Sequence, residues 1–357
     1  MKALVAMSGG VDSSVSALLA KQAGYDVTGV HMALLRGNDR VSGGGCCTVE
    51  DMQDARQVSA LIDIPFYVWD FSKEFQSAVV ADFLREYKAG RTPNPCIRCN
   101  EFVKFNFLKD KASELGFDAI ITGHYARNVY NEHTQTYELH RAKNIAKDQS
   151  YVLAVMGQKS LEHSIFPLGE IKTKDEVRHI ALENGLPVSK KAESYDVCFI
   201  ERGKTKEYLI DNLGARDGYV LSTSGQIIGT HKGAYLYTIG QRKGLDLKNP
   251  LGNGVPLYVV GKNIERNEIT VGTKNDLNVT EIHCDQAIWY DNIDLTLPLY
   301  AQLRAHGEPQ AVTITRNESA PNEFTCVTKD ASFVGVATGQ SLVLYSGDRV
   351  VGCGTIA

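Results

Sequence analysis

The sequence contains no long apolar run and does not begin with a cationic, apolar leader. A single lysine near the first residue is followed by a short apolar stretch. A membrane helix needs roughly 20 apolar residues, and a secretory leader needs a basic segment, an apolar core and a cleavage site. We therefore expect a cytoplasmic protein that neither spans a membrane nor is secreted.

Positive charge is not in excess. The chain has 38 Lys and Arg residues against 42 Asp and Glu residues, a formal net charge of −4. This balance excludes a globally basic nucleic-acid-binding protein and leaves room for a local basic surface. The hydrophobic fraction of 43% is ordinary for a globular protein, and 357 residues suffice for two or three domains.

The glycine-rich loop near the beginning of the chain lacks both common nucleotide-binding signatures. It has neither the Gly-Lys-Ser/Thr ending of the usual triphosphate loop nor the Gly-x-Gly-x-x-Gly spacing of dinucleotide sites. Gly9 and Gly10 allow the backbone to approach an anion, while serine hydroxyls and the N–H groups of a new helix can bind it. The segment follows the apolar run Leu4–Ala6 and precedes a helix-like stretch, so it predicts a phosphate-binding turn rather than a simple helix start.

Apolar runs alternate with amphipathic stretches over the first two hundred residues. This alternation is typical of a parallel sheet covered by helices, the doubly wound α/β class. Ligands on such sheets bind beyond the carboxyl ends of the strands, where the loop after Ala6, the segment after Met32 and the pair Gly123-His124 fall. We expect these stretches to meet in one pocket. The expected strands are Leu4–Ala6, Val27–Met32, Phe66–Trp69 and Ala119–Thr122, and the expected helices lie near 14–23, 50–62, 72–88, 101–115 and 173–184.

The composition changes beyond about residue 202. Closely spaced glycines between 218 and 261 separate short runs with Tyr and Val, which indicates a small β-rich domain. Later short runs separated by polar turns predict an antiparallel β-barrel. These runs are Glu268–Val271, Gln286–Tyr290, Leu299–Arg304, Gln310–Thr315 and Ser341–Tyr345. We divide the chain into an α/β domain (1–202), a central domain (203–265) and a C-terminal barrel (266–357).

The chain has eight cysteines but only one Cys-x-x-Cys pair, Cys96 and Cys99. A tetrahedral zinc site would need a second such pair or a Cys/His pair at ligand spacing, so no metal site is expected. The pair lies in a Pro-rich loop before a helix expected to begin near Glu101, and Arg91 and Arg98 flank it. Positive charge and a helix N-terminus favour the thiolate. A redox pair and a catalytic nucleophile both remain open.

The other cysteines carry weaker signals. Cys198 follows a polar loop in an apolar segment, which leaves a buried and a functional role equally open. Cys46-Cys47 are adjacent, which makes them poor partners for each other, and we expect them in a loop. Cys284, Cys326 and Cys353 fall in β-rich segments and are expected to pack as small apolar residues.

Five motifs follow one another along the chain: Ser-Gly-Gly-x-Asp-Ser at 8–13, Arg-Thr-Pro-Asn-Pro-Cys-x-x-Cys-Asn at 91–100, Thr-Gly-His-Tyr-Ala-Arg at 122–127, Lys-Asp-Gln-Ser-Tyr at 147–151 and Asp-Val-Cys-Phe-Ile at 196–200. Together they resemble the motifs of the tRNA-specific 2-thiouridylases, the MnmA/TrmU family of ATP pyrophosphatases. Two further motifs, at 240–245 and 338–340, extend the resemblance along the chain. It implies a PP-loop fold for the first domain and ATP-dependent 2-thiolation of the wobble uridine of tRNA(Lys), tRNA(Glu) and tRNA(Gln).

The resemblance also implies site residues. Cys99 occupies the position of the nucleophile, and Cys198 occupies the position that carries a persulfide. Many members have Asp where this chain has Cys96, which leaves three possibilities open: Cys96 is a thiolate that helps to deprotonate the target base, it is a spare thiol, or water or another group deprotonates the base. The residues that match the family's ATP site are Ala6, Met7, Ser8, Gly9, Gly10, Val11, Asp12, Ser13, Met32 and Gly123. Those that match the stretch contacting the target base are Asn94, Pro95 and Cys96. Those that match the family's tRNA contacts are His124, Lys147, Asp148, Gln149, Arg304, Ala305 and Gln340.

The implied chemistry makes the C2 oxygen of uracil a good leaving group. ATP adenylates that oxygen, and Asp12 helps to hold Mg²⁺ on the departing pyrophosphate. A persulfide on Cys198 supplies sulfur, and Cys99 and Cys198 end joined in a transient disulfide, the usual kind in the cytosol. The implied partners are tRNA and a persulfide donor, such as a sulfur-relay protein or a cysteine desulfurase. One large tRNA per chain favours a monomer.

Three alternatives stay open. An adenylating enzyme for a small amide or acid would need neither Cys99 nor Cys198. A metallocluster protein would use Cys96, Cys99 and Cys198 as ligands of an iron–sulfur cluster. A tRNA-binding module with an inactive loop is the third, and the intact motif at 8–13 argues against it.

Overall fold

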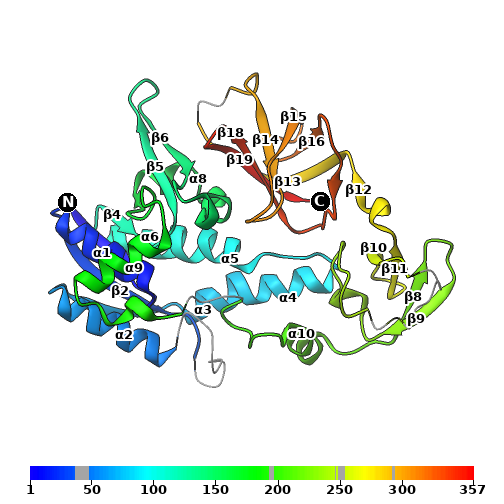
Figure 1. The fold of residues 1–357 in the computed structure, drawn as a ribbon, viewed down its shortest axis with the longest axis horizontal. Helices are drawn as coiled ribbons and strands as arrows, with labels where there is room; N and C mark the ends of the chain where they lie inside the picture. Colours follow the sequence, from blue (N-terminus) through cyan, green and yellow to red (C-terminus); the bar gives the residue numbers. More distant parts are fainter. Residues whose placement is uncertain (37–47, 193–196, 246, 248–253, 292–293) are drawn as a thin grey trace.

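The computed structural model describes residues 1–36, 48–192, 197–245, 247, 254–291 and 294–357. Cys46-Cys47 and the polar residues just before Val197 lie outside the described residues. Figure 1 shows a layered α/β body at the N-terminal end, a small sheet at the far end of two long helices, and a barrel beside those helices. Among the described residues, no helix combines the length and apolar character needed to cross a membrane.

A five-stranded parallel sheet forms the core of the first domain. Its strands are β1 (Lys2–Ala6), β2 (Asp26–Ala33), β3 (Phe66–Asp70), β4 (Ala119–Ile121) and β7 (Ser164–Ile165), in the order β3-β2-β1-β4-β7. Alternate residues of β1 pack on opposite faces: Ala3 and Val5 belong to one apolar cluster, Leu4 and Ala6 to another. Both faces are therefore covered, which confirms the expected doubly wound sheet.

Two sets of helices cover the faces. On one side, Val15 and Leu18 of α1 and Val58 of α2 join the cluster of Ala3 and Val5. The helices of that cluster are α1 (Val11–Gln22), α2 (Val49–Leu61) and α9 (Lys174–Glu183). Two continuous helical stretches supply apolar residues to the other face. They are α3 (Ser72–Phe75) with η2 (Gln76–Val80) and α4 (Ala81–Lys88), and α5 (Pro95–Arg98) with η3 (Cys99–Leu108) and α6 (Lys109–Glu114).

The helix expected to begin near Glu101 begins at Pro95. The Asn94 side chain accepts hydrogen bonds from the backbone N–H groups of Cys96 (3.1 Å) and Ile97 (3.3 Å), and Pro95 occupies the first helical position. Asn at the N-cap and Pro at the next residue are both strong helix starts. The Cys-x-x-Cys pair therefore lies inside a helix and not in the loop before it.

The central domain is a four-stranded sheet. Its strands are β8 (Gly218–Ser222), β9 (Ile227–His231), β10 (Tyr258–Asn263) and β11 (Glu268–Gly272), in the order β10-β11-β8-β9, and α10 (Thr205–Leu213) precedes them. We expected the run Glu268–Val271 in the barrel, and this placement is wrong. The run lies inside the central sheet, antiparallel to β10 and parallel to β8. A short apolar run shows its strand character in the sequence but not its partners.

The C-terminal strands close into a six-stranded antiparallel barrel. They are β13 (Glu281–Trp289), β14 (Leu299–Gln302), β15 (Gln310–Arg316), β16 (Phe324–Thr328), β18 (Ser341–Ser346) and β19 (Arg349–Ile356). The order is β13-β16-β15-β14-β18-β19, and pairing of β13 with β19 completes the ring. Cys284, Cys326 and Cys353 are buried in these strands, which confirms that they pack as small apolar residues. Shorter elements are η4 (Ile145–Lys147), α7 (Ser150–Leu153), η5 (Ala154–Met156), α8 (Gly157–Glu162), η6 (Pro187–Lys190), η7 (Ala234–Leu236), η8 (Lys274–Leu277), β12 (Asn278–Val279) and β17 (Phe333–Val334).

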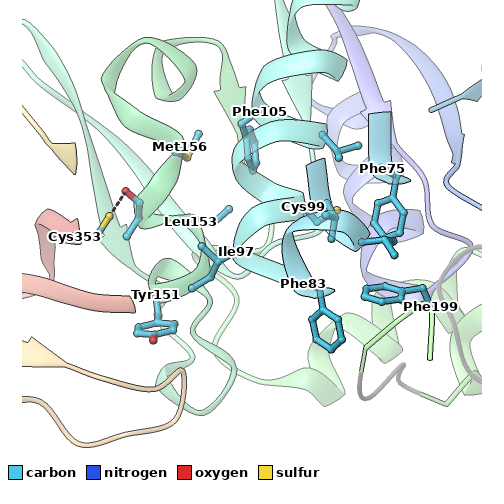
Figure 2. Packing of buried hydrophobic residues seen from close by; sticks show 14 of the residues in the cluster. Phe75, Phe83, Ile97, Cys99, Phe105, Tyr151, Leu153, Met156, Phe199 and Cys353 are labelled. Carbon is cyan, nitrogen blue, oxygen red and sulfur yellow. Dashed lines mark hydrogen bonds between the residues drawn. The ribbon is translucent and has the colours of Figure 1, made fainter. Parts of the chain in front are cut away.

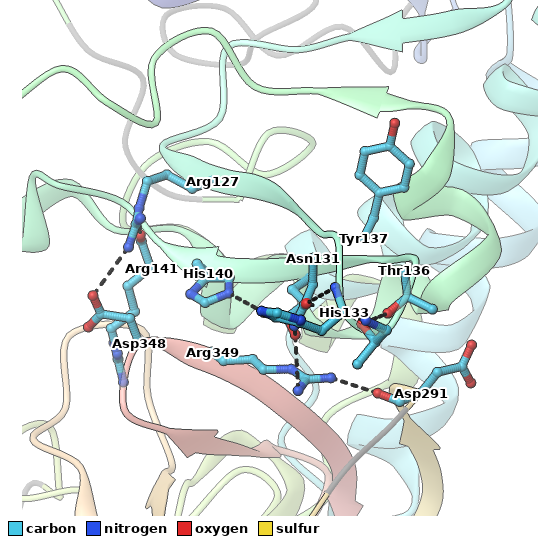
Figure 3. A network of polar contacts seen from close by, with 12 residues as sticks. Arg127, Asn131, His133, Thr136, Tyr137, His140, Arg141, Asp291, Asp348 and Arg349 are labelled. Atoms are coloured by element: carbon cyan, nitrogen blue, oxygen red, sulfur yellow. Dashed lines mark hydrogen bonds and ion pairs between the residues drawn. The ribbon is translucent and has the colours of Figure 1, made fainter.

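A hairpin of the first domain, absent from the sequence-based expectation, joins the barrel. It consists of β5 (Ala126–Asn131) and β6 (Thr136–Arg141), and β6 pairs with β19 at His140 and Arg349. Figure 3 shows polar contacts along this seam, among them those of Arg127 with Asp348 and of Arg349 with Asp291. Glu138 of β6 accepts a hydrogen bond from Asn131 at 2.9 Å and lies 3.1 Å from the Arg349 guanidinium. The barrel is therefore bound edge to edge to the α/β domain.

A buried polar cluster reinforces this junction. Arg141 at the end of β6 lies 3.2 Å from the Asp148 carboxylate and donates to Gln302 Oε1 of β14 at 2.7 Å. Its guanidinium lies 3.6 Å from the centre of the Tyr345 ring, and Ser150 Oγ links Asp148 (2.7 Å) to the Tyr345 hydroxyl (3.1 Å). All five residues are at least nine-tenths buried. The cluster holds two domains together through fully paired groups.

We expect Arg141→Ala to destabilise the protein by about 3–5 kcal/mol, because it leaves the Asp148 carboxylate buried without its cation. The thermal unfolding midpoint, followed by circular dichroism, measures the loss. Lys204→Ala is the control, since Lys204 pairs with Glu201 at the surface and its removal should leave the midpoint close to that of wild type. Equal midpoints for the two variants would contradict this role for Arg141.

Candidate active site

The candidate site lies where the order of strands reverses. The chain leaves β1 for β2 on one side, while β4 lies on the other side of β1. The crevice at the carboxyl ends of such neighbouring strands is the usual ligand site of doubly wound sheets. A cavity of about 490 Å³ opens there. It is lined by residues from the loop after β1, the ends of β2 and β4, helix α5–η3, the turn at 147–149, the segment 197–199 and the barrel turn at 305–306.

Two glycines shape the loop after β1. Gly9 has φ +78°, and a Cβ there would lie 2.1 Å from the Asp51 carbonyl oxygen at the start of α2. A Cβ on Gly123, just after β4, would lie 2.7 Å from the Ser13 backbone nitrogen. Ser13 Oγ accepts from the Ser8 backbone N–H at 3.2 Å, which closes the loop over the first turn of α1. The backbone is thus held close to a helix N-terminus, as anion binding requires.

Asp12 in the first turn of α1 is part of an ion pair that the sequence did not reveal. Lys174, the first residue of α9, donates to both carboxylate oxygens at 2.6 and 2.7 Å, and the Tyr125 hydroxyl donates at 2.7 Å. Lys174 begins a helix that we did expect, but nothing in its sequence context shows that it faces the loop. The carboxylate at the phosphate loop is therefore already neutralised by a cation.

Lys191 approaches the loop from its other side. Its Nζ donates to the Gly9 carbonyl oxygen at 3.1 Å and to Asp51 at 2.7 Å, and it also binds Asp54. Burial lowers the pKa of Lys191, but its hydrogen bonds to Asp51 and Asp54 outweigh that effect, so its pKa is raised. Lys191 stays charged and ties the end of η6 (Pro187–Lys190) to the phosphate loop.

Three cysteines line the same cavity. Cys96 and Cys99 come from one helix, and Cys198 comes from the segment near residue 200. Cys99 is 9% exposed, Cys198 is half-buried and Cys96 is exposed. Figure 2 shows Phe199 packed beside the helices, with its ring centre 5.7 Å from that of Phe75 and 5.3 Å from that of Phe83. This aromatic contact anchors the residue next to Cys198 against the helical layer.

His124 is a buried neutral group in the cavity wall. Burial lowers the pKa of His124 well below its ordinary value, and the nearby Lys104 ammonium lowers it further. Lys104 Nζ lies 3.5 Å from Nε2, and Nδ1 lies 2.7 Å from Thr122 Oγ1. Since an ammonium only donates, Nε2 accepts from Lys104 and Nδ1 donates to Thr122. Among the described residues, Lys104 has no ion-pair partner, so it brings an unneutralised cation to the cavity.

The turn at 147–149 and the barrel turn at 304–305 are held together. The Asp148 carboxylate accepts hydrogen bonds from Arg141, Ser150 and the Ala142 backbone N–H. Gln302, which also binds Arg141, donates to the carbonyl oxygens of residues 304 and 305 at 2.7 and 3.0 Å. Gln149 Oε1 accepts from the Tyr125 backbone N–H at 2.9 Å. The two turns therefore face the cavity at a fixed separation.

The structure brings most of the expected site residues to this cavity, although not all. Those that line it are Ala6, Met7, Ser8, Asp12, Ser13, Met32, Pro95, Cys96, Cys99, Gly123, His124, Lys147, Asp148, Gln149, Cys198 and Ala305. Gly9, Gly10 and Val11 form the loop without lining the cavity. Asn94 lines a smaller cavity of about 30 Å³ against the barrel. Arg304 donates to the Gly335 carbonyl oxygen at 3.1 Å, and Gln340 donates to the Thr92 carbonyl oxygen at 3.4 Å.

Several lining residues were missed by the sequence-based list. Thr122 and His306 add polar groups, and Phe75, Val79 and Val152 add an apolar wall. His31 lies at the end of β2, with Nδ1 2.9 Å from the Met7 carbonyl oxygen. Thr122 and His31 follow the expected carboxyl-end rule and could have been found from it. The apolar wall could not, because its residues have the same pattern as any core residue.

The described residues contain no cluster of three or more His, Cys, Asp or Glu side chains arranged to hold a metal ion. Asp12 and Asp148 are the two carboxylates among the described lining residues, and both are already paired. Mg²⁺ commonly keeps waters and binds one carboxylate plus phosphate oxygens. Asp12 would fill such a single-carboxylate role by exchanging Lys174 for the ion, since Lys174 now binds both of its oxygens. The described residues hold no closed protein site for a metal.

Comparison with known proteins covers the whole chain. Three family models match in order: a tRNA methyl transferase HUP domain over residues 1–202, a tRNA methyl transferase PRC-barrel domain over 206–273 and an aminomethyltransferase beta-barrel domain over 279–356. The second match includes strand β11 and ends just before the barrel. The full-length relatives, which align along the whole chain, have a different name from these methyl transferase domains.

Those relatives are named tRNA-specific 2-thiouridylase MnmA. The protein of Beutenbergia cavernae is 48% identical over 100% of this chain and 95% of its own length. The protein of Streptomyces avermitilis is 49% identical, with the same coverage of both chains. Among solved structures, a 4-thiouridine synthetase–RNA complex with bound ATP aligns with 59% of this chain and 50% of its own, at 15% identity and a TM-score of 0.36. That likeness is too low to carry an argument.

We expect Gly123→Ala to weaken ATP binding at least tenfold, about 1.4 kcal/mol, because its Cβ would push against the backbone of Ser13. Calorimetric titration with a non-hydrolysable ATP analogue measures the affinity. Gly261→Ala is the matched control, since its Cβ would lie 3.6 Å from Thr270 in the central sheet, an ordinary contact. Equal affinities of the two variants would show that the approach of β4 to the loop is not needed for ATP.

We expect His124 to make the protein less stable as the pH falls. The unfolded chain protonates this histidine near pH 6.5, whereas the folded protein does so only at lower pH, so the unfolded state binds more protons between these values. When the pH falls from about 7.5 to about 5.5, the free energy of unfolding of wild type should drop by about 1 kcal/mol more than that of His124→Asn. Urea unfolding at both pH values measures this, with the exposed His133→Asn as control. An identical loss in wild type and His124→Asn would contradict it.

Proposed function

The chain belongs to the tRNA-specific 2-thiouridylase family, and from this premise we propose that it is a tRNA-uridine 2-sulfurtransferase. In this role it uses ATP to replace the C2 oxygen of the wobble uridine of tRNA(Lys), tRNA(Glu) and tRNA(Gln) by sulfur. The products are 2-thiouridine, AMP and pyrophosphate. ATP, Mg²⁺, tRNA and a persulfide donor are the expected participants, and a monomer is the expected working unit.

One observation carries the proposal: the phosphate loop, Cys99, Cys198 and the two turns tied to the barrel face a single cavity of about 490 Å³. A nucleotide at the loop, a base beside the cysteines and an RNA strand along the turns could thus meet without a large movement of domains. An adenylating enzyme for a small substrate would have no need for the barrel turn at 305–306 or for the cysteines.

The first step is activation of the base. Ser8, Ser13 and the backbone N–H groups of the α1 N-terminus bind the departing pyrophosphate, and AMP is transferred to the C2 oxygen. Lys104 is placed to stabilise negative charge, since it enters the cavity without an ion-pair partner among the described residues. Mg²⁺, bound by Asp12 and the phosphates, would neutralise charge on the leaving pyrophosphate.

The second step transfers sulfur. The outer sulfur of a persulfide on Cys198 attacks C2, and AMP leaves. The Cys99 thiolate then attacks the inner sulfur, so that a Cys99–Cys198 bond forms while the bond to the transferred sulfur breaks and 2-thiouridine is released. In a second route, Cys99 opens the persulfide first and sulfide attacks C2. Both routes end with the same disulfide.

The base must leave its stack to reach this cavity. A wobble uridine lies in a single-stranded loop, so its extrusion costs less than opening a duplex. The extruded base would contact Pro95, the turn at 147–149 and Ala305, because these residues line the same cavity as the cysteines. Arg304 and Gln340 lie outside the cavity on the barrel side, where the rest of the anticodon arm would pass.

We expect wild-type protein to form 2-thiouridine in unmodified tRNA(Glu) when supplied with Mg·ATP and a persulfide donor, and Cys99→Ala and Cys198→Ala to lose at least 99% of this activity. Loss of a nucleophile typically costs several orders of magnitude in rate. Liquid chromatography of nucleosides, together with AMP release, measures both half-reactions. Transcripts of tRNA(Lys) and tRNA(Gln), and one with cytidine at the wobble position, test the substrate range.

Cys326→Ala is the matched control, because Cys326 is buried in the barrel core away from the cavity and should keep the activity. Thiolation by Cys99→Ala at the wild-type rate would contradict the two-cysteine route. AMP release without any thiouridine would support the loop assignment and contradict tRNA as the substrate. Iron in anaerobically purified protein, lost on Cys198→Ala, would favour the cluster alternative.

A further inference from the structure

We propose that Cys96 is the resolving thiol of the catalytic cycle: it attacks the Cys99–Cys198 disulfide, takes over the bond to Cys99 and presents the new disulfide to cellular thiols. The inference rests on the proposed function, because it needs the disulfide that sulfur transfer leaves behind. It assigns a role to the cysteine whose part in the chemistry the sequence left open.

Access from solvent differs sharply among the three sulfur atoms of the cavity. Cys99 is 9% exposed and Cys198 is half-buried beside Phe199, which packs between Phe75 and Phe83. Cys96 is exposed and lines the same cavity. Thiol–disulfide exchange needs direct attack along the S–S bond, so a bulky reductant reaches a bond at Cys96 more readily than one between Cys99 and Cys198.

The helix start gives Cys96 the properties of an attacking thiol. Cys96 is the second residue of α5, and its backbone N–H is capped by Asn94 at 3.1 Å. A negative charge in the first turn of a helix is stabilised by the positive end of the helix dipole, which favours the thiolate. Unlike Cys99, Cys96 combines this position with exposure.

The spacing of the pair permits a disulfide. Helical geometry places the Cα atoms of residues three apart at roughly 5 Å, inside the 4.4–6.8 Å range of disulfides. Cys96 and Cys99 are related in this way within one continuous helix from Pro95. No domain has to move for the bond to transfer from Cys198 to Cys96.

The step balances without an added oxidant. The Cys96 thiolate attacks Cys99 Sγ, the Cys96–Cys99 bond forms, the Cys99–Cys198 bond breaks and Cys198 leaves as a thiolate ready for a new persulfide. A low-molecular-weight thiol or a dithiol protein then reduces Cys96–Cys99 with two electrons and regenerates both thiols. The same reductant is needed for any cycle that ends in a disulfide.

The other described cysteines cannot serve this role. Cys284, Cys326 and Cys353 lie in the barrel core and do not line the cavity. Burial raises the pKa of the Cys326 and Cys353 thiols to about 12, which keeps them protonated and inert at neutral pH. Cys353 also donates to the Ala154 carbonyl oxygen at 3.4 Å, a structural contact seen in Figure 2.

The test traps the disulfide after one turnover. Persulfide-loaded wild type, Cys96→Ser and Cys96→Asp are each mixed with tRNA(Glu) and Mg·ATP without added thiol, quenched in acid, alkylated and mapped by peptide mass spectrometry. We expect the Cys96–Cys99 peptide in wild type and the Cys99–Cys198 peptide in both variants. With glutathione as reductant, the ratio of multiple-turnover to single-turnover rate should fall at least tenfold in both variants, and concentrated dithiothreitol should restore it.

Each other outcome overturns the proposal. A Cys99–Cys198 disulfide in wild type, or glutathione-supported turnover of Cys96→Ser at the wild-type ratio, shows that Cys96 does not resolve the bond. Recovery by Cys96→Asp alone assigns Cys96 to proton transfer, because a carboxylate can accept a proton and cannot exchange disulfides. Iron lost on Cys96→Ser identifies a cluster ligand. Absence of thiouridine from wild type itself refutes the proposed function, and the resolving role with it.

Discussion

The buried contact of Arg141 with Asp148 and Gln302 is the constraint on which the rest of this structure depends. It joins the hairpin of the α/β domain, the turn at 147–149 and strand β14 of the barrel in one cluster with paired charges. Burying these groups is favourable only because each has a partner. The cavity has a barrel-side wall because this contact fixes the barrel against the sheet, so stability and substrate geometry share the same residues.

Each carboxylate among the described lining residues of the cavity is paired with a cation. Asp12 is paired with Lys174, and Asp148 with Arg141, so the two carboxylates among the described lining residues add no net negative charge. His124 is neutral because burial and Lys104 depress its pKa. The cavity therefore keeps a cation for an incoming anion although the chain as a whole carries a formal charge of −4. Net charge is a poor guide to a nucleotide site, because the site depends on which charges remain unpaired locally.

The sequence predicted those parts of the fold that arise from local patterns. The alternation of apolar runs with amphipathic stretches and the phosphate loop both follow from residues near each other in the chain, and the structure confirms the sheet that they imply. The start of α5 at Pro95 was missed because an Asn-Pro cap was interpreted as a loop. Strand β11, the hairpin at 126–141 and Lys174 were misplaced or missed because their partners are distant in sequence. Pairing between distant segments leaves little local trace.

The barrel also reaches the helix that carries the two cysteines. Arg98, between Cys96 and Cys99, binds Glu101 of its own helix at 2.8 Å and donates to Gln286 Oε1 of β13 at 2.9 Å. Gln286 has φ +50° in an irregular part of that strand, a backbone conformation that costs free energy and persists only where its surroundings enforce it. The barrel thus contacts the cysteine helix through Gln286 and the cluster of Arg141 and Asp148 through Gln302. The helix and the turn at 147–149 both line the cavity, so the positions of these two walls depend on the barrel.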